Sequence, residues 1–306
     1  MNNLIYFIVG PTSIGKSEFA KKLARKINGQ IINADSMQVY KELCIITARP
    51  TKNETDEIKH HLYGHINCSE RYNVAKWCHQ ATNKINLCLK NKIAPILVGG
   101  TGLYIEKLIN GLIDIPSIPE NIKVETEDIF IKEGINEFYN RIKKIDPNIL
   151  NTIESNDSNR LKRIWDVYSF TGKNMTYWLQ NKSNFFLSNN IKYNLLLFLP
   201  NRIKNYNRVN KRFVKMIDSG AINEVNKLLK LNLNKSLPAM KAHGVPEISL
   251  FIENKISIDT CIKKGQQVTR NYVKRQHTWW KSSNLKIFKK FNQFPDEIDI
   301  KLMNFH

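Results

Sequence analysis

The chain has 306 residues, 42% of them hydrophobic, which is enough for one large α/β domain or two modest domains with packed cores. No apolar run approaches the roughly 18 residues that a membrane helix needs, so we expect a cytoplasmic protein that does not associate with membranes. We also expect it to be a monomer. The formal charge of +20 favours a polyanionic partner, and five cysteines without a Cys-x-x-Cys pair exclude a disulfide framework and a zinc knuckle.

The N-terminal residues predict a strand, a loop, a helix and a second strand. The apolar run 4–9 is typical of a strand buried on both faces, and it leads into a glycine-containing loop. From Ser17 to Ile27 the apolar residues recur at helical spacing. An extended segment then restarts at Ile31 and ends near Asp35, which completes a βαβ unit.

A second helix and strand follow at residues 73–90 and 95–98, and the strand ends in Gly99-Gly100-Thr101-Gly102. Alternating strands and helices indicate a parallel sheet with helices on both faces. Ligands bind such sheets at the carboxyl ends of the strands. The loops 10–17, 35–40 and 99–104 are therefore expected to meet at one edge.

The pattern changes after Gly111, where a proline-containing linker precedes a helical stretch over residues 121–180. Another strand is predicted at residues 193–199, and the remaining C-terminal third is expected to be mainly helical. We therefore expect an α/β fold whose P-loop NTPase-like core has a parallel β-sheet flanked by helices. This core would comprise residues 1–115 and 190–306, interrupted by an all-helical insertion at 116–189.

One motif points directly to phosphate chemistry. The segment 10–17 matches G-x-x-x-x-G-K-[ST] and lies between a predicted strand and a predicted helix. Its backbone N–H groups and the helix N-terminus can hold phosphate oxygens, while Lys16 bridges phosphates and the Ser17 hydroxyl binds Mg²⁺. The expected diphosphate-binding residues are Gly10, Pro11, Thr12, Ser13, Ile14, Gly15, Lys16 and Ser17.

Asp35 is the acidic residue expected at the mouth of this loop. The strand 95–98 ends in Gly-Gly-Thr rather than in the acidic residues with which motor ATPases hold Mg²⁺. Asp35 could therefore be a general base or a Mg²⁺ partner, or it could simply cap a turn before Ser36.

Taken together, the motifs resemble the tRNA dimethylallyltransferase (tRNA isopentenyltransferase, IPP transferase) family in its bacterial form, over nearly the whole chain. The resemblance rests on the order and spacing of several segments: residues 10–17, 35–40, 47–50, 60–62, 98–104, 159–163 with 171–172, and 274–279. Where the family usually has Ile-Gly-Tyr-Arg/Lys-Glu, this chain instead has His243-Gly244-Val245-Pro246-Glu247.

The resemblance implies transfer of a dimethylallyl group from dimethylallyl diphosphate, with Mg²⁺, to N6 of the adenosine immediately 3′ of the anticodon in tRNA (adenosine 37). Asp35 and Thr101 are the implied catalytic residues. The implied tRNA contacts to the anticodon stem-loop are Asp35, Ser36, Met37, Gln38, Thr101, Lys123, Asn159, Arg160, Leu161, Lys162, Arg163, Lys274, Arg275 and Gln276.

Two further groups of basic residues have two interpretations each: they bind RNA, or they form a solvated helix face. Lys204, Arg208, Lys211, Arg212 and Lys215 are expected on one face of the helix after Pro200. A further basic and aromatic cluster is expected near residues 270–281.

Two other readings remain open on the residues alone. A P-loop kinase for a small molecule or nucleoside would use Asp35 to orient a hydroxyl, and a non-catalytic RNA-binding protein would keep a vestigial site. His60, His61, His65 and Cys68 match no standard zinc spacing.

Overall fold

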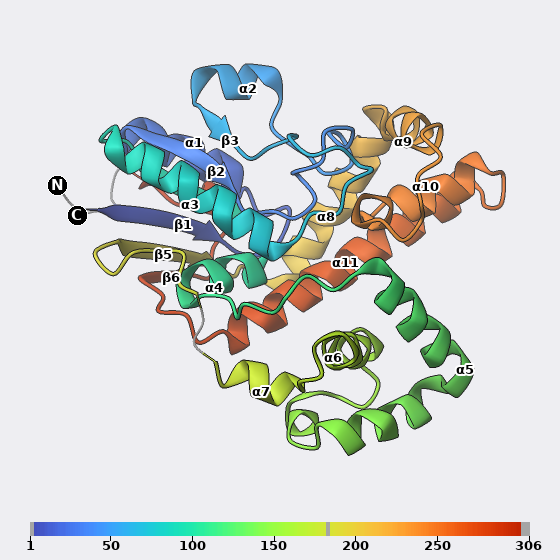
Figure 1. Ribbon diagram of the computed structural model, residues 1–306. Helices are drawn as coiled ribbons and strands as arrows, with labels where there is room; N and C mark the ends of the chain where they lie inside the picture. Colours follow the sequence, from blue (N-terminus) through green and yellow to red (C-terminus); the bar gives the residue numbers. More distant parts are fainter. Residues whose placement is uncertain (1–2, 182–183, 301–306) are drawn as a thin grey trace. The chain divides into compact units, whose positions relative to one another are not determined.

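The computed structural model describes residues 3–181 and 184–300, and the chain folds as two compact units (Figure 1). One unit contains Met1–Ile109 and Phe186–His306, and the other contains Asn110–Phe185. The sequence placed the insertion at 116–189. The helical unit starts earlier than that. The segment that enters it and the segment that leaves it are joined by a bridge between Leu112 and Asn184, so both residues belong to this unit.

The first unit is built on a six-stranded sheet in the order β3-β2-β4-β1-β5-β6, with all of its strand pairs parallel. The strands are β1 (Leu4–Val9), β2 (Gly29–Asn33), β3 (His60–His61), β4 (Ala94–Gly99), β5 (Lys192–Phe198) and β6 (Lys289–Phe291). Val9 lies opposite both Gly99 and Leu197, so three neighbouring strands end at the same edge. The expected parallel α/β fold is therefore confirmed.

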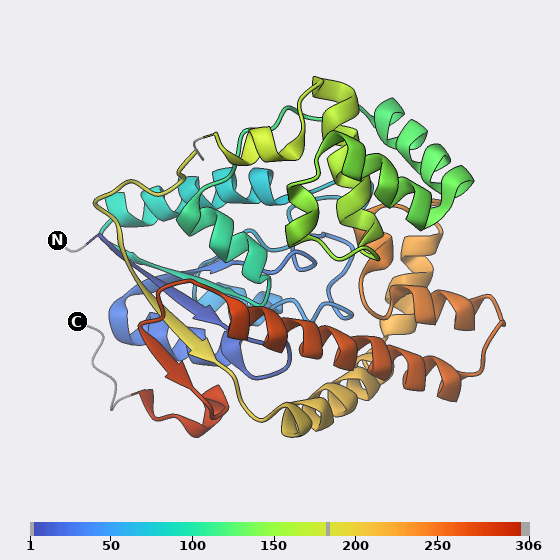
Figure 2. The same cartoon turned by 90° about the horizontal axis from the view of Figure 1, so that it is seen from below.

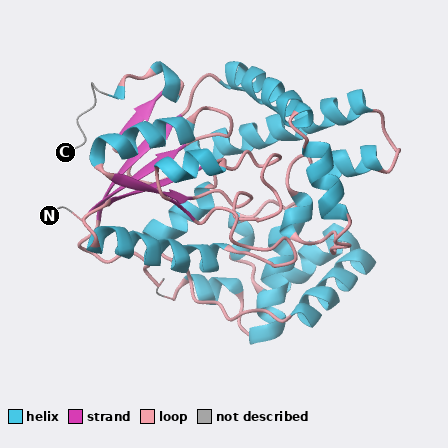
Figure 3. Cartoon of the chain, turned by 90° about the horizontal axis from the view of Figure 1, so that it is seen from above, coloured by secondary structure: helices cyan, strands magenta, loops and turns pink. Residues whose placement is uncertain are grey.

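Alternate strand residues face two separate cores, as the twofold period of a strand requires. Tyr6 and Ile8 of β1 pack on the side of α1 (Lys16–Ile27), while Phe7 and Val9 face the opposite core. Figure 3 shows helices on both faces of the sheet. This layering explains why the strands are apolar along their whole length.

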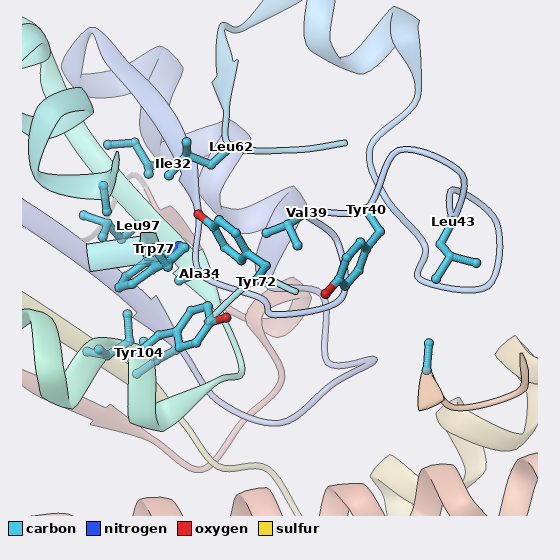
Figure 4. Close-up of a cluster of buried hydrophobic side chains, with 14 of the residues drawn as sticks. Ile32, Ala34, Val39, Tyr40, Leu43, Leu62, Tyr72, Trp77, Leu97 and Tyr104 are labelled. Carbon is cyan, nitrogen blue, oxygen red and sulfur yellow. The ribbon is translucent and has the colours of Figure 1, made fainter. Parts of the chain in front are cut away.

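The second core lies under α3 (Val74–Lys90) and α4 (Gly102–Asn110). Trp77 of α3 stacks on Tyr104 of α4 with ring centroids 4.7 Å apart. These rings pack beside strand residues Ile32 and Leu97, together with aromatic and aliphatic side chains of the intervening loops (Figure 4). Because Trp77 also donates from Nε1 to the carbonyl of Asn33 at 2.7 Å, this core fixes the end of β2.

The C-terminal part is mainly helical, as the sequence predicts. It contains α8 (Arg202–Asp218), α9 (Ala221–Leu229), α10 (Val245–Ile252) and α11 (Ile258–Ser282), and α8 packs along α11 (Figure 2). The strand β6 then adds to β5 as an edge strand, which the sequence analysis missed. Three residues, two of them lysines, give too short an apolar pattern to recognise.

Two short elements were also not expected. The helix α2 (Lys52–Glu57) begins with a capping box between Thr51 and Glu54, and β3 adds two residues beside β2. Both lie between β2 and α3, where the sequence shows no sustained periodicity.

The described residues of the second unit are mainly helical, with a bridge between Leu112 and Asn184. It contains α5 (Glu120–Ile145), α6 (Ser158–Thr171) and α7 (Met175–Leu179). Gly134 has φ of 74° and kinks α5, so that helix follows a bent path around its own small core. Phe138, Ile142, Leu161 and Ile164 form the centre of that core.

Candidate functional site

The phosphate-type loop leaves β1 after Val9 and enters α1 at Lys16. Its backbone is tied to the other end of the chain, because Thr12 N donates to Gln276 Oε1 at 2.9 Å. The Gln276 amide in turn donates to the carbonyl of Gly100 at 2.9 Å. Gln276 was expected to touch tRNA, but it is only 5% exposed and instead joins two loops inside the protein.

Close packing explains the glycines at the end of β4. A Cβ on Gly99 would lie 2.0 Å from the carbonyl oxygen of Ala34. A Cβ on Gly100 would lie 2.2 Å from Nε2 of Gln276. Neither position can carry a side chain without moving its neighbours, so these glycines let three loops approach one another.

Asp35 is held in a tight turn at the end of β2. The buried Asn33 accepts from Asp35 N at 2.8 Å, and Asp35 Oδ1 accepts from Met37 N at 2.9 Å. Thr101 Oγ1 accepts from Ser36 N at 3.1 Å. The structure thus brings Thr101 to the Asp35 turn, and Asp35 both caps the turn, as one reading proposed, and lines a cavity.

We call that cavity the loop cavity. It has a volume of about 290 Å³, and Lys16, Ser17 and Asp35 all line it. Its wall also includes Gln38 and Arg212. The loop and the carboxylate that the sequence singled out therefore face the same space.

The electrostatics of the loop cavity centre on Lys16. Burial lowers the pKa of its ammonium to about 7; the Asp35 carboxylate opposes this shift, and Arg212 adds to it. Lys16 Nζ donates to the carbonyl of Pro11 at 2.6 Å. An anion in this cavity would favour the charged form of Lys16.

Arg212 is a cavity residue that the sequence analysis placed only on a basic helix face. It projects from α8, and its Nη1 donates to Ser13 Oγ at 3.0 Å, while burial lowers its pKa and Asp35 partly offsets that shift. One turn earlier, Arg208 pairs with both oxygens of Asp296 at 2.9 Å. The expected common basic face therefore has at least two different uses, which a run of charges at helical spacing could not distinguish.

A second space, the apolar cavity, adjoins the loop cavity and has a volume of about 270 Å³. The two cavities share Thr12, Ser13, Asp35, Thr47 and Arg212. The aliphatic and phenyl part of its wall consists of Met37, Ile46, Val209, Phe213, Met216 and Ala242. Asp35 thus stands where a polar, cationic space meets a hydrophobic one.

Aromatic and polar side chains complete the apolar cavity. His243 and Tyr272 have ring centroids 4.7 Å apart, and both line the space with Arg275. Burial lowers the pKa of His243, which keeps its imidazole neutral at pH 7, and burial raises the pKa of the Tyr272 hydroxyl. His243 lies within the segment that departs from the usual family pattern.

The remaining expected tRNA residues fall into two groups. Lys274 and Arg275 are exposed on α11 in the first unit. In the helical unit, Asn159, Arg160 and Arg163 are exposed on α6, whereas Leu161 is fully buried in that unit's core. Leu161 is therefore a packing residue in this structure.

Two lysines of the helical unit pair with carboxylates. Lys162 Nζ lies 2.8 Å from Glu127, and Lys123 Nζ lies 3.0 Å from Glu120. Both pairs are partly exposed to solvent, where such interactions contribute little to stability.

The histidine-rich segment does not form a metal centre within the described residues. His61 Nε2 pairs with Gln30 at 2.7 Å and His65 Nε2 pairs with Gln80 at 2.7 Å, while Cys68 is buried. No helix in the part of the chain that the structure describes is long and apolar enough to cross a membrane.

With this geometry established, comparison with known proteins identifies the family. The IPP transferase family model matches residues 38–283. A tRNA dimethylallyltransferase of Ehrlichia chaffeensis is 41% identical over 281 residues, covering 92% of this chain and 91% of that relative. The chain belongs to the IPP transferase family. A second relative, a tRNA dimethylallyltransferase of Wolbachia pipientis wMel, is 40% identical over 305 residues, covering 99% of this chain and 97% of that relative.

Solved structures of IPP transferase family proteins agree with this assignment. The full-length tRNA isopentenylpyrophosphate transferase of Bacillus halodurans is 28% identical, with a TM-score of 0.68, covering 98% of this chain and 92% of that protein. A eukaryotic dimethylallyltransferase acting on tRNA gives a TM-score of 0.75 at 28% identity, with 90% and 69% covered. The resemblance read from the sequence motifs is confirmed.

Proposed function

We propose that the protein transfers the dimethylallyl group of dimethylallyl diphosphate to N6 of adenosine 37 in tRNA, giving N6-(dimethylallyl)adenosine and diphosphate. The observation that carries this proposal is the junction of the two cavities at Asp35. A prenyl diphosphate has a polyanionic end and an apolar end, and the two spaces match those ends in chemistry.

The diphosphate end would lie in the loop cavity. The backbone amides of residues 10–17, the N-terminus of α1, Lys16 and Arg212 offer positive charge and hydrogen-bond donors to phosphate oxygens. As the C–O bond to the diphosphate breaks, the leaving group takes the electron pair, and these groups would stabilise the developing charge.

Mg²⁺ is the metal that the residues of this cavity fit. Ser17, Glu18 and Asp35 all line it, and hydroxyl and carboxylate oxygens are the hard donors that Mg²⁺ prefers. We propose Ser17 as the residue that holds it. When bound, the ion would neutralise part of the charge on the diphosphate.

Asp35 would serve the acceptor. The exocyclic amine of adenine is a weak nucleophile because its lone pair is delocalised into the ring. A carboxylate within hydrogen-bond reach would accept the proton that N6 loses as its new bond to the allylic carbon forms. Thr101, bonded to the backbone of the Asp35 turn, would keep that turn in place.

The tRNA would reach this site with adenosine 37 turned out of its stack, at an unstacking cost of about a few kcal/mol. Exposed basic residues, Lys274 and Arg275 on α11 and Arg160 and Arg163 on α6, would contact the anticodon stem-loop. We also propose that the protein acts as a cytoplasmic monomer.

The decisive experiment incubates purified protein with unmodified tRNA, Mg²⁺ and labelled dimethylallyl diphosphate. We expect label in the nucleoside 3′ of the anticodon, and none with a tRNA that carries guanosine there. Absence of label, together with phosphate transfer from ATP to a small acceptor, would replace the proposal with the kinase alternative.

A further inference from the structure

A single carboxylate on α9 holds three successive backbone amides of a loop that lines both cavities. Glu224 Oε2 accepts from Cys44 N and from Ile45 N, each at 2.8 Å, and its Oε1 accepts from Ile46 N at 2.9 Å. Glu224 lies in the first turn of α9, far from residue 44 in sequence. Both of its carboxylate oxygens are therefore committed to this loop.

The loop itself contributes to the walls of the site. Ile46 and Thr47 line the apolar cavity, while Thr47 and Ala48 line the loop cavity. Residues 44–48 lie in no helix or strand. Two backbone hydrogen bonds close the loop on itself, from Ala48 N to Ile45 O and from Arg49 N to Cys44 O, each at 2.9 Å, and side-chain contacts attach it to the rest of the protein.

Other side chains hold the opposite end of the same loop. Gln38 Nε2 donates to the carbonyls of Thr47 at 2.9 Å and Ala48 at 3.0 Å. Ala48 has a φ of 48°, in the left-handed region that costs energy for a residue with a Cβ. A loop with such strain keeps its shape only where neighbouring groups determine it.

We propose that Glu224 is a positioning residue for the prenyl donor, an inference that rests on the proposed function. Its carboxylate would fix Ile46 and Thr47 at the point where the diphosphate and the dimethylallyl group meet. Only a carboxylate offers acceptors at both oxygens. A glutamine would turn an NH₂ group toward at least one of the three N–H donors.

The test compares Glu224→Gln with Glu42→Gln. Glu42 is a matched control because its carboxylate also accepts a backbone N–H, that of Cys68 at 2.9 Å, but bonds to none of the amides of residues 44–46. We expect Glu224→Gln to raise the KM for dimethylallyl diphosphate by about tenfold, the effect of losing one charge-assisted hydrogen bond. The affinity for tRNA should not change, and Glu42→Gln should leave the donor KM at its wild-type value.

If Glu224→Gln does not fold, Glu224→Asp keeps both oxygens at a shorter reach and should give a smaller rise in donor KM. A wild-type protein that prenylates tRNA, with a variant whose donor KM is unchanged and whose Tm alone falls, overturns the positioning role and leaves the proposed function intact. A wild-type protein without transfer activity overturns both.

Discussion

The loop cavity and the surface of α6 both carry positive charge, but they hold it in different ways. Lys16 and Arg212 are half-buried and line one cavity with Asp35, and desolvation there lowers the pKa of each cation. Arg160 is exposed and lies 3.3 Å from Asp157, a neighbour in the same helix. Charges in the cavity therefore act through position, whereas charges on the surface act mainly through their number and respond to salt.

This contrast predicts the largest effect at Asp35. Replacing it with asparagine keeps the shape of the side chain and its acceptor for Met37 N but removes the proton acceptor. We expect kcat to fall by about 10²–10⁴-fold, the usual contribution of a general base. Affinity for tRNA, measured by filter binding, should stay within a factor of two or so of wild type. An Asp35→Asn enzyme with wild-type turnover would remove the acid–base role.

Arg212 should follow, with an effect on donor binding. Arg212→Ala removes a half-buried cation from the loop cavity, so the KM for dimethylallyl diphosphate should rise by roughly 10- to 100-fold. Arg208→Ala is the control on the same helix, since Arg208 pairs with Asp296 outside that cavity. Equal kinetic effects from both substitutions would show that charge alone, and not its place, matters.

The surface of α6 should give a smaller and salt-dependent effect. Replacing Arg160 and Arg163 with glutamine should weaken tRNA binding and lower the slope of log affinity against log salt by about 1–2. Donor KM should be unchanged. Binding that keeps the wild-type slope would mean that these arginines face only solvent.

The smallest expected effect is the uptake of a proton when the diphosphate binds. Burial lowers the pKa of the Lys16 side chain to about 7, so above pH 7 it is mainly the neutral amine in the free protein. A bound diphosphate stabilises the charged form, so binding at pH 8 should take up about one proton and weaken as pH rises further. Calorimetry in two buffers of different ionisation enthalpy measures this uptake. Lys16→Arg, which stays charged, should bind without it.

The sequence predicted the sheet and its phosphate loop because both depend on local patterns. A buried apolar strand, six residues and a helix suffice to place Lys16, and Asp35 follows from the next strand end. Arg212 and Glu224 could not be placed in the same way. Their partners, Ser13 and residues 44–46, are distant in sequence, and only the packing of α8 and α9 brings them together.

The same reasoning explains what the sequence motifs could not resolve. Gln276 and Leu161 lie within motifs shared with the family, but motif membership does not distinguish a surface contact from a buried one. The edge strand β6 was missed because its three residues carry no pattern of their own, and their extended conformation depends on pairing with β5.

The link between Thr12 and Gln276 has a consequence for biosynthesis. These residues are 264 positions apart, so the phosphate loop acquires its supporting amide only after residue 276 has been synthesised. Contacts of such long range close late in folding. The phosphate loop is therefore made well before the residue that supports its backbone, and its final geometry depends on α11 having folded against it.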